Sequence, residues 1–300
     1  MLGIHNDLVH HDFIDGYTGI VDLPEGATAA YGLRRLSSTY FGYALTVRRA
    51  SDNATKAIKF NSFGTQVLDQ ATIESFCAGT DGFVSIWNDQ SGQSNDLEQT
   101  DTALQPQIVE NGSVITNPDT GNFSIKFVSD CLFTPSNLTV LDETIAGYYG
   151  TAVFCAELDS SVGTAATALF ENGLVVSGSP SGLTVGLKSG GSAILTTSGN
   201  SPEAVNTLSN IYDTHIYKSK LHGPSLSAGV DDTATTTQAI DLDALAGSMN
   251  TVKLFMGSRS DFTEKFTGFM SEFILYNKVD FNNESADEVA DAMNSFHGVY

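Results

Sequence analysis

The chain is a succession of short segments rich in β-branched and aromatic residues, separated by turns of Gly, Asn, Asp and Ser. Such segments predict strands, because alternate side chains of a strand face opposite sides of a sheet. Many evenly spaced strands with few helices indicate a mainly β fold, an antiparallel jelly-roll sandwich of two sheets. The strands are expected at 43–48, 82–87, 123–128, 151–158, 182–187, 251–257 and 269–276.

Two short helices are expected beside these strands. The first covers Gln70 to Phe76, and the second covers Ala286 to Phe296 near the C-terminus. Ser285 and Glu288 have the spacing of a capping box at the start of the second helix. We expect this short C-terminal helix to close one end of the sandwich.

The charge balance excludes two classes of partner. The 300 residues include 14 Lys and Arg against 35 Asp and Glu, a net charge of −21. Nucleic acid and anionic membrane surfaces are held largely through basic side chains, so neither is expected as a partner. No stretch approaches the 18 or so uninterrupted apolar residues of a membrane span. The first residues lack a basic segment before an apolar one, so no secretory signal is expected.

Basic residues gather near the start of the chain, notably Arg34, Arg35, Arg48 and Arg49. They have two possible uses: docking onto an acidic partner, or pairing with the chain's own carboxylates. No linker is long enough to divide the chain. We therefore expect an N-terminal arm over residues 1–30, used for attachment, and one jelly-roll domain over residues 31–300.

Cysteines and carboxylates give little sign of a cofactor. Cys77, Cys131 and Cys155 are odd in number and far apart, which predicts buried, reduced thiols rather than disulfides or a zinc site. Asp89 and Asp96 are weak candidates for Ca²⁺, because hard cations favour clustered carboxylate oxygens. Their other use is structural, within a tight turn between Trp87 and Leu97. We expect no cofactor, with calcium as the open alternative.

Five motifs occur in order within residues 30–115 and carry a resemblance to known families. They are Ala30-Tyr-Gly-Leu-Arg-Arg-Leu36, Val47-Arg-Arg-Ala-Ser-Asp52, Ser75-Phe-Cys-Ala-Gly-Thr80, Trp87-Asn-Asp-Gln-Ser-Gly92 and Pro106-Gln-Ile-Val109. This set resembles the first part of the catalytic domain of fungal α-L-arabinofuranosidase B, a concanavalin A-like sandwich. It also resembles a LamG-like jelly-roll domain of tailed-phage virion proteins, to whose closing strands residues 255–276 are similar. Both resemblances imply a jelly roll.

The arabinofuranosidase resemblance implies candidates for catalysis. A retaining glycosidase needs two carboxylates about 5 to 5.5 Å apart. Glu171, within 169–174, resembles the family's nucleophile, although Leu169 replaces an acidic residue that the family uses to bind sugar. Asp261 is the nearest match to the family's acid/base residue. The alternative interpretation is therefore a retaining glycoside hydrolase that uses Glu171 and Asp261.

The cysteine pattern departs from that family. The vicinal cysteine pair of its sugar pocket has no counterpart here, and Gly82 replaces the partner of Cys77 in its short disulfide loop. Both differences fit assembly in a reducing cytoplasm. The favoured interpretation is a non-enzymatic structural protein of the bacteriophage virion, assembled in the host cytoplasm. It would be displayed on the particle as a capsid decoration or tail fibre, as a homo-oligomer with other virion proteins as partners.

Glycan binding for host adhesion is a further hypothesis. Jelly rolls commonly present aromatic side chains to sugars in loops at one edge. The candidates are Tyr148, Tyr149, Tyr212 and Tyr217, which lie in or near such loops. The other interpretation of each tyrosine is burial in the core.

Overall fold

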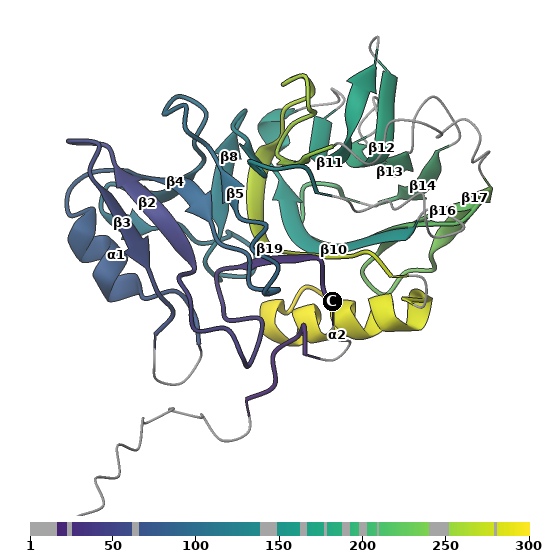
Figure 1. The fold of residues 1–300 in the computed structure, drawn as a ribbon, viewed down its shortest axis with the longest axis horizontal. Helices are drawn as coiled ribbons and strands as arrows, with labels where there is room; N and C mark the ends of the chain where they lie inside the picture. Colours follow the sequence, from purple (N-terminus) through teal and green to yellow (C-terminus); the bar gives the residue numbers. More distant parts are fainter. Residues whose placement is uncertain are drawn as a thin grey trace, which may run out of the picture.

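The computed structural model is mainly β, with antiparallel strand pairs throughout its sheets (Figure 1). It describes residues 17–22, 26–61, 66–138, 149–162, 167–176, 179–187, 193–197, 203–208, 210–239, 252–278 and 281–300. The strands are β1 (Ala29–Gly32), β2 (Leu45–Arg49), β3 (Thr55–Ile58), β4 (Gly82–Trp87), β5 (Leu97–Glu98), β6 (Gln107–Glu110), β7 (Ser113–Val114), β8 (Ile125–Val128), β9 (Leu132–Phe133), β10 (Tyr149–Leu158), β11 (Thr167–Val176), β12 (Ser179–Leu187), β13 (Ala193–Thr197), β14 (Ala204–Thr207), β15 (His215–His222), β16 (Ser225–Val230), β17 (Thr236–Ala239), β18 (Leu254–Met256) and β19 (Thr267–Tyr276). The helices are α1 (Gln70–Phe76), the 3-10 turn η1 (Ser160–Val162) and α2 (Asn283–His297).

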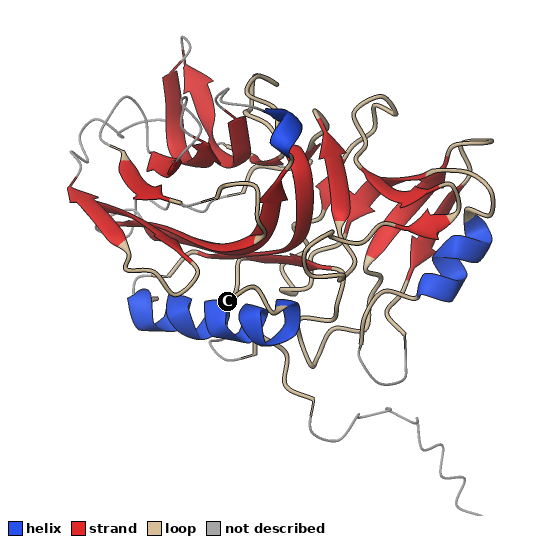
Figure 2. Cartoon of the chain, turned by 180° about the vertical axis from the view of Figure 1, so that it is seen from behind, coloured by secondary structure: helices blue, strands red, loops and turns tan. Residues whose placement is uncertain are grey.

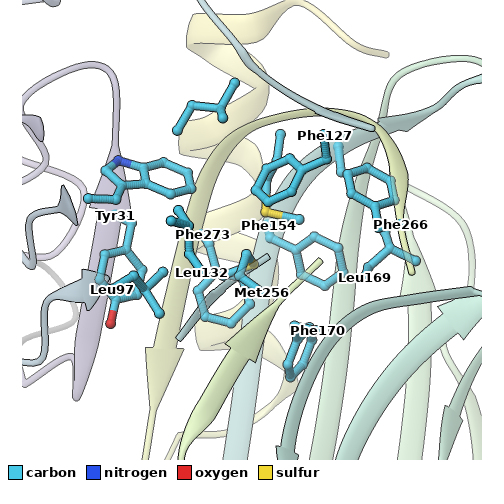
Figure 3. Packing of buried hydrophobic residues seen from close by; sticks show 14 of the residues in the cluster. Tyr31, Leu97, Phe127, Leu132, Phe154, Leu169, Phe170, Met256, Phe266 and Phe273 are labelled. Atoms are coloured by element: carbon cyan, nitrogen blue, oxygen red, sulfur yellow. The ribbon is translucent and has the colours of Figure 1, made fainter. Parts of the chain in front are cut away.

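Two layers of strands enclose the main core. In one layer β10 pairs with β15 and β19, and in the other β11 pairs with β12 and β18. Aromatic rings join the layers: Phe170 of β11 lies 5.5 Å from Phe154 of β10 and 5.0 Å from Phe273 of β19, between ring centroids (Figure 3). The predicted antiparallel sandwich is therefore confirmed.

One hydrophobic cluster runs through the whole described fold. It contains Val47 and Trp87 of the β2 and β4 region as well as Phe154 and Phe170 of the main sandwich. Tyr31 of β1 connects the two parts, because its ring lies 5.7 Å from Trp87 and 6.2 Å from Phe273. The β2–β4 region and the main sandwich therefore share a core (Figures 1 and 3).

Helix α2 covers the outer face of the layer that contains β10 and β15 (Figure 2). Val289 and Met293 of the helix belong to a second buried cluster with Val153, Ile216 and Ile274 of the strands beneath. The C-terminal helix therefore covers a sheet face and does not close one end of the sandwich as predicted, because its apolar side packs on β10 and β15. No helix among the described residues is long and apolar enough to cross a membrane.

The helix starts follow local capping chemistry. Helix α1 has the predicted bounds, and the Asp69 side chain accepts a hydrogen bond from Thr72 N at 3.1 Å. Helix α2 begins three residues earlier than predicted. Asn282, rather than Ser285, supplies the cap, because its Oδ1 accepts from Ser285 N at 2.9 Å.

The described part of the expected N-terminal arm is packed onto the domain. Ile20, Val21 and Ala27 are buried in the cluster beneath α2. Strand β1 starts within the arm at Ala29 and pairs with β19. Residues 1–16 of the arm lie outside the described residues. The proposed division at residue 30 stays a prediction, although the chain before it already contributes to the core.

The turn after β4 is held by two carboxylates. Asp89 accepts hydrogen bonds from Ala30 N at 2.8 Å, Ser91 N at 2.9 Å and Asn95 N at 3.0 Å. Asp96 accepts from Asp89 N at 2.8 Å. This is the structural use predicted for the segment. In the described ranges no group of three or more His, Cys, Asp or Glu side chains is arranged to hold a metal ion, and calcium at these residues remains untested.

The three cysteines are buried and free, as predicted. Gly82 lies directly beside Cys77, since a Cβ atom at this glycine would be 2.8 Å from the cysteine Sγ. The position of the missing disulfide partner is thus occupied by a glycine in contact with the thiol.

Candidate active site

A row of side chains crosses the outward face of the layer containing β11. Glu171 of β11 pairs in register with Thr184 of β12 and with Phe255 of β18, and Phe255 pairs with Phe133 of β9. Directly paired residues project from the same face of a sheet. The adjacent Phe170 packs among the core rings (Figure 3). Because neighbouring residues of a strand face opposite sides of the sheet, the row that contains Glu171 lies on the face away from the second layer.

The loop at 257–266, between β18 and β19, lies against the start of β11. Ala168 N donates a hydrogen bond to Glu264 O at 2.6 Å, and Ser260 N donates to Glu171 Oε2 at 2.7 Å. Asp261 follows Ser260 in this loop. The packing of the loop on the strand thus places Ser260 against Glu171, and the charge of the neighbouring Asp261 is close enough to raise the pKa of Glu171.

Glu171 has an oxygen that the described structure leaves unused. Its side chain is fully buried at 0% exposure, and Oε1 has no hydrogen-bond partner in the described part of the chain. Thr184, opposite it on β12, also has a buried hydroxyl without a partner there. Burying such groups unpaired costs about 1 to 3 kcal/mol each. Glu171 Oε1 and Thr184 Oγ1 belong to directly paired residues. Such a pair of buried polar atoms without protein partners is expected where a ligand supplies the missing hydrogen bonds.

The two carboxyl groups have opposite pKa shifts. Burial raises the pKa of Glu171 to about 7, the Asp261 charge adds to this, and the Ser260 N–H and Arg259 oppose it. Burial also raises the pKa of Asp261, but hydrogen bonds from Thr263 and the charge of Arg259 outweigh it and lower the pKa below its ordinary value. One carboxyl can therefore hold a proton under conditions in which the other is ionised, the division of roles that acid/base chemistry requires.

The charge of Arg259 is shared. Its guanidinium lies 2.9 Å from the carboxylate of Glu264, measured from Nε to Oε2. Arg259 therefore has a carboxylate partner other than Glu171, which limits how far it can stabilise an ionised Glu171.

An aromatic group adjoins these carboxylates. Phe133 and Phe255 stack with ring centroids 5.5 Å apart, and Phe262 meets them edge-on at 6.4 and 5.9 Å. Phe262 is 43% exposed and has a backbone φ of 62°. A bulky residue in this left-handed region is strained, and such strain concentrates at functional sites.

The tyrosines predicted to bind glycans are not members of this row. Tyr217 is only 1% exposed and stacks on Phe154 at 5.0 Å, so its ring is in the core instead of a loop. Tyr212 is half-buried and packs against the same core, and Tyr149 of β10 contacts the His222 ring at 4.5 Å. Tyr148 lies outside the described residues.

The four arginines proposed for docking are used within the chain. Arg34 forms a bidentate pair with Glu272, with N–O distances of 2.8 and 3.0 Å, and Arg49 pairs with Asp52 at 2.6 Å. The alternative of pairing with the chain's own carboxylates is therefore correct for these two.

Arg35 and Arg48 bind neutral groups of the chain itself. Both are buried. Arg35 donates to Ser37 O at 2.9 Å, and Arg48 donates to Gln105 Oε1 at 2.6 Å. Their guanidinium groups thus satisfy acceptors inside the fold.

The sequence analysis missed most neighbours of Glu171. Phe133, Thr184, Phe255 and Phe262 join the site through pairing between strands distant in sequence and through loop conformation. The one available local signal was Phe262, a large apolar residue in a polar loop, adjacent to Asp261.

Comparison with known proteins places the chain near arabinofuranosidases. Residues 24–122 match the family model described as the catalytic domain of α-L-arabinofuranosidase B. An α-L-arabinofuranosidase of Hypocrea jecorina is 46% identical over 66 residues, which are 22% of this chain and 13% of that protein. A probable α-L-arabinofuranosidase B of Aspergillus flavus is also 46% identical over 66 residues, with the same shares.

Solved structures extend the likeness in fold to most of the chain. An arabinofuranosidase complexed with arabinofuranosyl-α-1,2-xylobiose matches with a TM-score of 0.68 and 16% identity, over 92% of this chain and 65% of that one. A mutant of a GH54 α-L-arabinofuranosidase, soaked with 4-nitrophenyl α-L-arabinofuranoside, gives a TM-score of 0.64 at 15% identity, over the same shares. The chain thus spans less than two thirds of the length of these proteins.

These matches correct the favoured interpretation from the sequence. The sequence relatives and the fold neighbours are glycoside hydrolases, so the expectation of a non-enzymatic phage virion protein is wrong. The expected virion localisation and virion partners are wrong as well, since the curated relatives are fungal arabinofuranosidases. The differences in cysteine pattern had favoured a phage protein, and that interpretation of them was wrong.

Proposed function

We propose that this chain is a retaining glycoside hydrolase of the arabinofuranosidase type. The observation that carries the proposal is the buried Glu171 carboxyl, one oxygen of which has no partner among the described residues while the other accepts from Ser260 N, next to Asp261 in the loop at 257–266. Two carboxyl groups with divergent pKa values are what glycosidic cleavage by double displacement requires. The match of residues 24–122 to the arabinofuranosidase B catalytic domain supports the arabinofuranosyl group as the sugar that is released.

The pKa shifts of the two carboxyl groups favour one division of roles, which is part of the proposal. Ionised Asp261 attacks the anomeric carbon as the bond to the leaving oxygen breaks, and protonated Glu171 gives its proton to that oxygen. Glu171 then takes a proton from water, whose oxygen displaces Asp261 and restores both groups. This assignment is the reverse of the one implied by the sequence resemblance, in which Glu171 is the nucleophile. It follows from the raised pKa of Glu171 and the lowered pKa of Asp261.

Hydrolysis of 4-nitrophenyl α-L-arabinofuranoside tests the proposal, since a fold neighbour was soaked with this compound. Glu171→Gln and Asp261→Asn should each lower kcat/KM by at least about a hundredfold, a typical effect of losing a catalytic acid or base. Glu110→Gln, which alters an exposed carboxylate on β6, is the control and should leave the rate unchanged. A wild-type protein that hydrolyses no arabinofuranoside would refute the activity.

The division of roles has its own test. Glu171→Ala should retain turnover of 2,4-dinitrophenyl α-L-arabinofuranoside, whose leaving group needs no proton, and azide should accelerate it. Asp261→Ala should be inactive on this substrate. The opposite pattern would support the roles implied by the sequence resemblance.

The pH dependence follows from the same assignment. With Glu171 as the acid, kcat/KM of the wild type should fall as the pH rises through about 7. The acid limb should lie below the ordinary range of an aspartate, because the pKa of Asp261 is lowered. An activity that stays constant from pH 6 to 9 would exclude Glu171 as the proton donor.

A further inference from the structure

We propose that Phe262, supported by Phe133 and Phe255, is the platform that binds the leaving-group sugar of the substrate. The proposal rests on the proposed hydrolase activity and adds the chemistry of the group released. Phe262 is adjacent to Asp261 in the chain, and Phe255 is the register partner of Glu171. The aromatic group therefore adjoins both carboxylates.

Phe262 is partly exposed although it contacts two other aromatic rings. It lies at an interplanar angle of 87° to Phe255 and 78° to Phe133, a T-shaped contact with each. Phe133 and Phe255 stack on each other at 29°. With 43% of Phe262 exposed, the ring is held by its neighbours and is still accessible to a ligand.

The backbone of the loop is strained where it carries this ring. Phe262 has a φ of 62° and Glu264 a φ of 47°, and Gly257 precedes them with 85°. Glycine or asparagine would adopt these angles more readily than phenylalanine. The loop is nevertheless fixed by hydrogen bonds from Phe262 N to Arg259 O at 2.9 Å and from Arg259 N to Thr263 O at 3.2 Å. A phenylalanine at such a position is not explained by local conformation, which points to a contact with substrate.

The chemistry of the platform indicates the class of sugar. An aromatic face binds flat, apolar surfaces, and a pyranose with only equatorial hydroxyls presents C–H groups on both faces. Lys253 lies over the Phe133 ring at 5.0 Å and adds a hydrogen-bond donor at the border of the platform. The fit is to a neutral chain of such pyranoses, as in a xylo-oligosaccharide carrying the arabinofuranosyl group.

Two substrates separate platform binding from catalysis. Arabinofuranosyl-α-1,2-xylobiose has a disaccharide as its leaving group, whereas methyl α-L-arabinofuranoside has one too small to cover a ring. Phe262→Gly should lower kcat/KM about tenfold for the trisaccharide and less than about threefold for the methyl glycoside, while Phe262→Tyr retains most of the trisaccharide rate. Phe41→Ala, which removes another exposed ring, is the matched control and should change neither rate. Equal losses on both substrates for Phe262→Gly would overturn the proposal.

A binding measurement and a melting curve keep the test independent of turnover. Calorimetry of xylotetraose with the Glu171→Gln protein should show binding that the added Phe262→Gly substitution weakens about tenfold. Unchanged binding would refute the platform, whereas absence of hydrolysis by the wild type would refute only the activity.

Phe262→Gly should also raise the melting temperature, because glycine relieves the positive φ. A clear fall in the melting temperature would identify the ring as a packing element and refute its role in binding.

Discussion

Glu171 and Glu272 are buried to the same extent, on strands of the two opposing layers, but the pKa values of their carboxyl groups are shifted in opposite directions. Both side chains are 0% exposed. The pKa of Glu171 is raised to about 7, whereas that of Glu272 is lowered to about 2. Burial raises the pKa in both cases, so the difference comes from the groups that surround each carboxylate.

The Glu272 carboxylate has a dedicated cationic partner, Arg34, and a histidine ring within hydrogen-bond distance. Arg34 donates two hydrogen bonds to it, and His297 Nε2 lies 3.2 Å from its Oε2. Glu171 instead accepts a hydrogen bond from the neutral Ser260 N–H, and the nearby Arg259 is shared with Glu264. The number of committed counter-charges thus distinguishes a carboxylate that holds the fold from one that remains available for chemistry.

The largest effect on this comparison is expected from removing the counter-charge of Glu272. Arg34→Met should lower the free energy of unfolding by about 3 to 5 kcal/mol, because an ionised carboxylate is left buried without its partner. Urea denaturation at pH 7 measures the change. Arg49→Met breaks an ion pair at the surface and serves as the control, with no comparable loss expected. Equal stability of the two variants would show that Glu272 does not depend on Arg34.

Neutralising the two glutamates should change stability in opposite directions. The native pKa of Glu171 is above its ordinary value of 4.5, so ionisation disfavours folding. Glu171→Gln should therefore be more stable than the wild type by about 3 kcal/mol at pH 8, a gain that disappears as the pH falls from 7 to below 4.5. Glu272→Gln should be less stable than the wild type at pH 7.

The pH series for Glu272 has the reverse sign. Its native pKa is lowered, so its stabilising effect is fully present above 4.5 and is lost as the pH falls through about 2. Urea melts of both variants and the wild type between pH 3 and 8 measure these differences. A Glu171→Gln protein that is less stable at every pH would show that the charged carboxylate is structural.

The smallest expected effect comes from giving Glu171 a counter-charge of its own. Glu264→Gln removes the competitor for Arg259, whose charge lowers the pKa of Glu171. The basic limb of the kcat/KM profile should then shift to lower pH by about half a unit. Glu110→Gln, at an exposed carboxylate on β6, is a control of equal charge change. A shift to higher pH in the Glu264→Gln profile would contradict this account of Arg259.

Local features of the fold could be predicted from the sequence because their causes are local. The segment at 82–87 alternates as a strand and is β4, and Asp69 caps α1 at the predicted residue. The start of α2 was missed because Asn282 and Ser285 are both capping residues. The local pattern does not show which of them binds the first turn.

The site could be predicted only in part, because it depends on pairing over long distances in sequence. Glu171 and Asp261 were identified as a possible pair from a resemblance. That Phe255 lies beside Glu171 follows from the register of β11 and β18, which no local pattern records. The arginines show the same limit: their charge was visible in the sequence, whereas the Glu272 partner of Arg34 lies 238 residues away.

The pairing of β1 with β19 has a consequence for the order of folding. Strand β1 lies at Ala29–Gly32 and its partner at Thr267–Tyr276, so β1 cannot pair until a segment more than two hundred residues later has been made. Until β19 emerges from the ribosome, Tyr31 lacks Phe273 and Arg34 lacks Glu272. Folding dominated by such non-local contacts is slow and leaves strand edges open for long periods. Chaperone binding to the nascent chain is therefore expected to persist until β19 has been made.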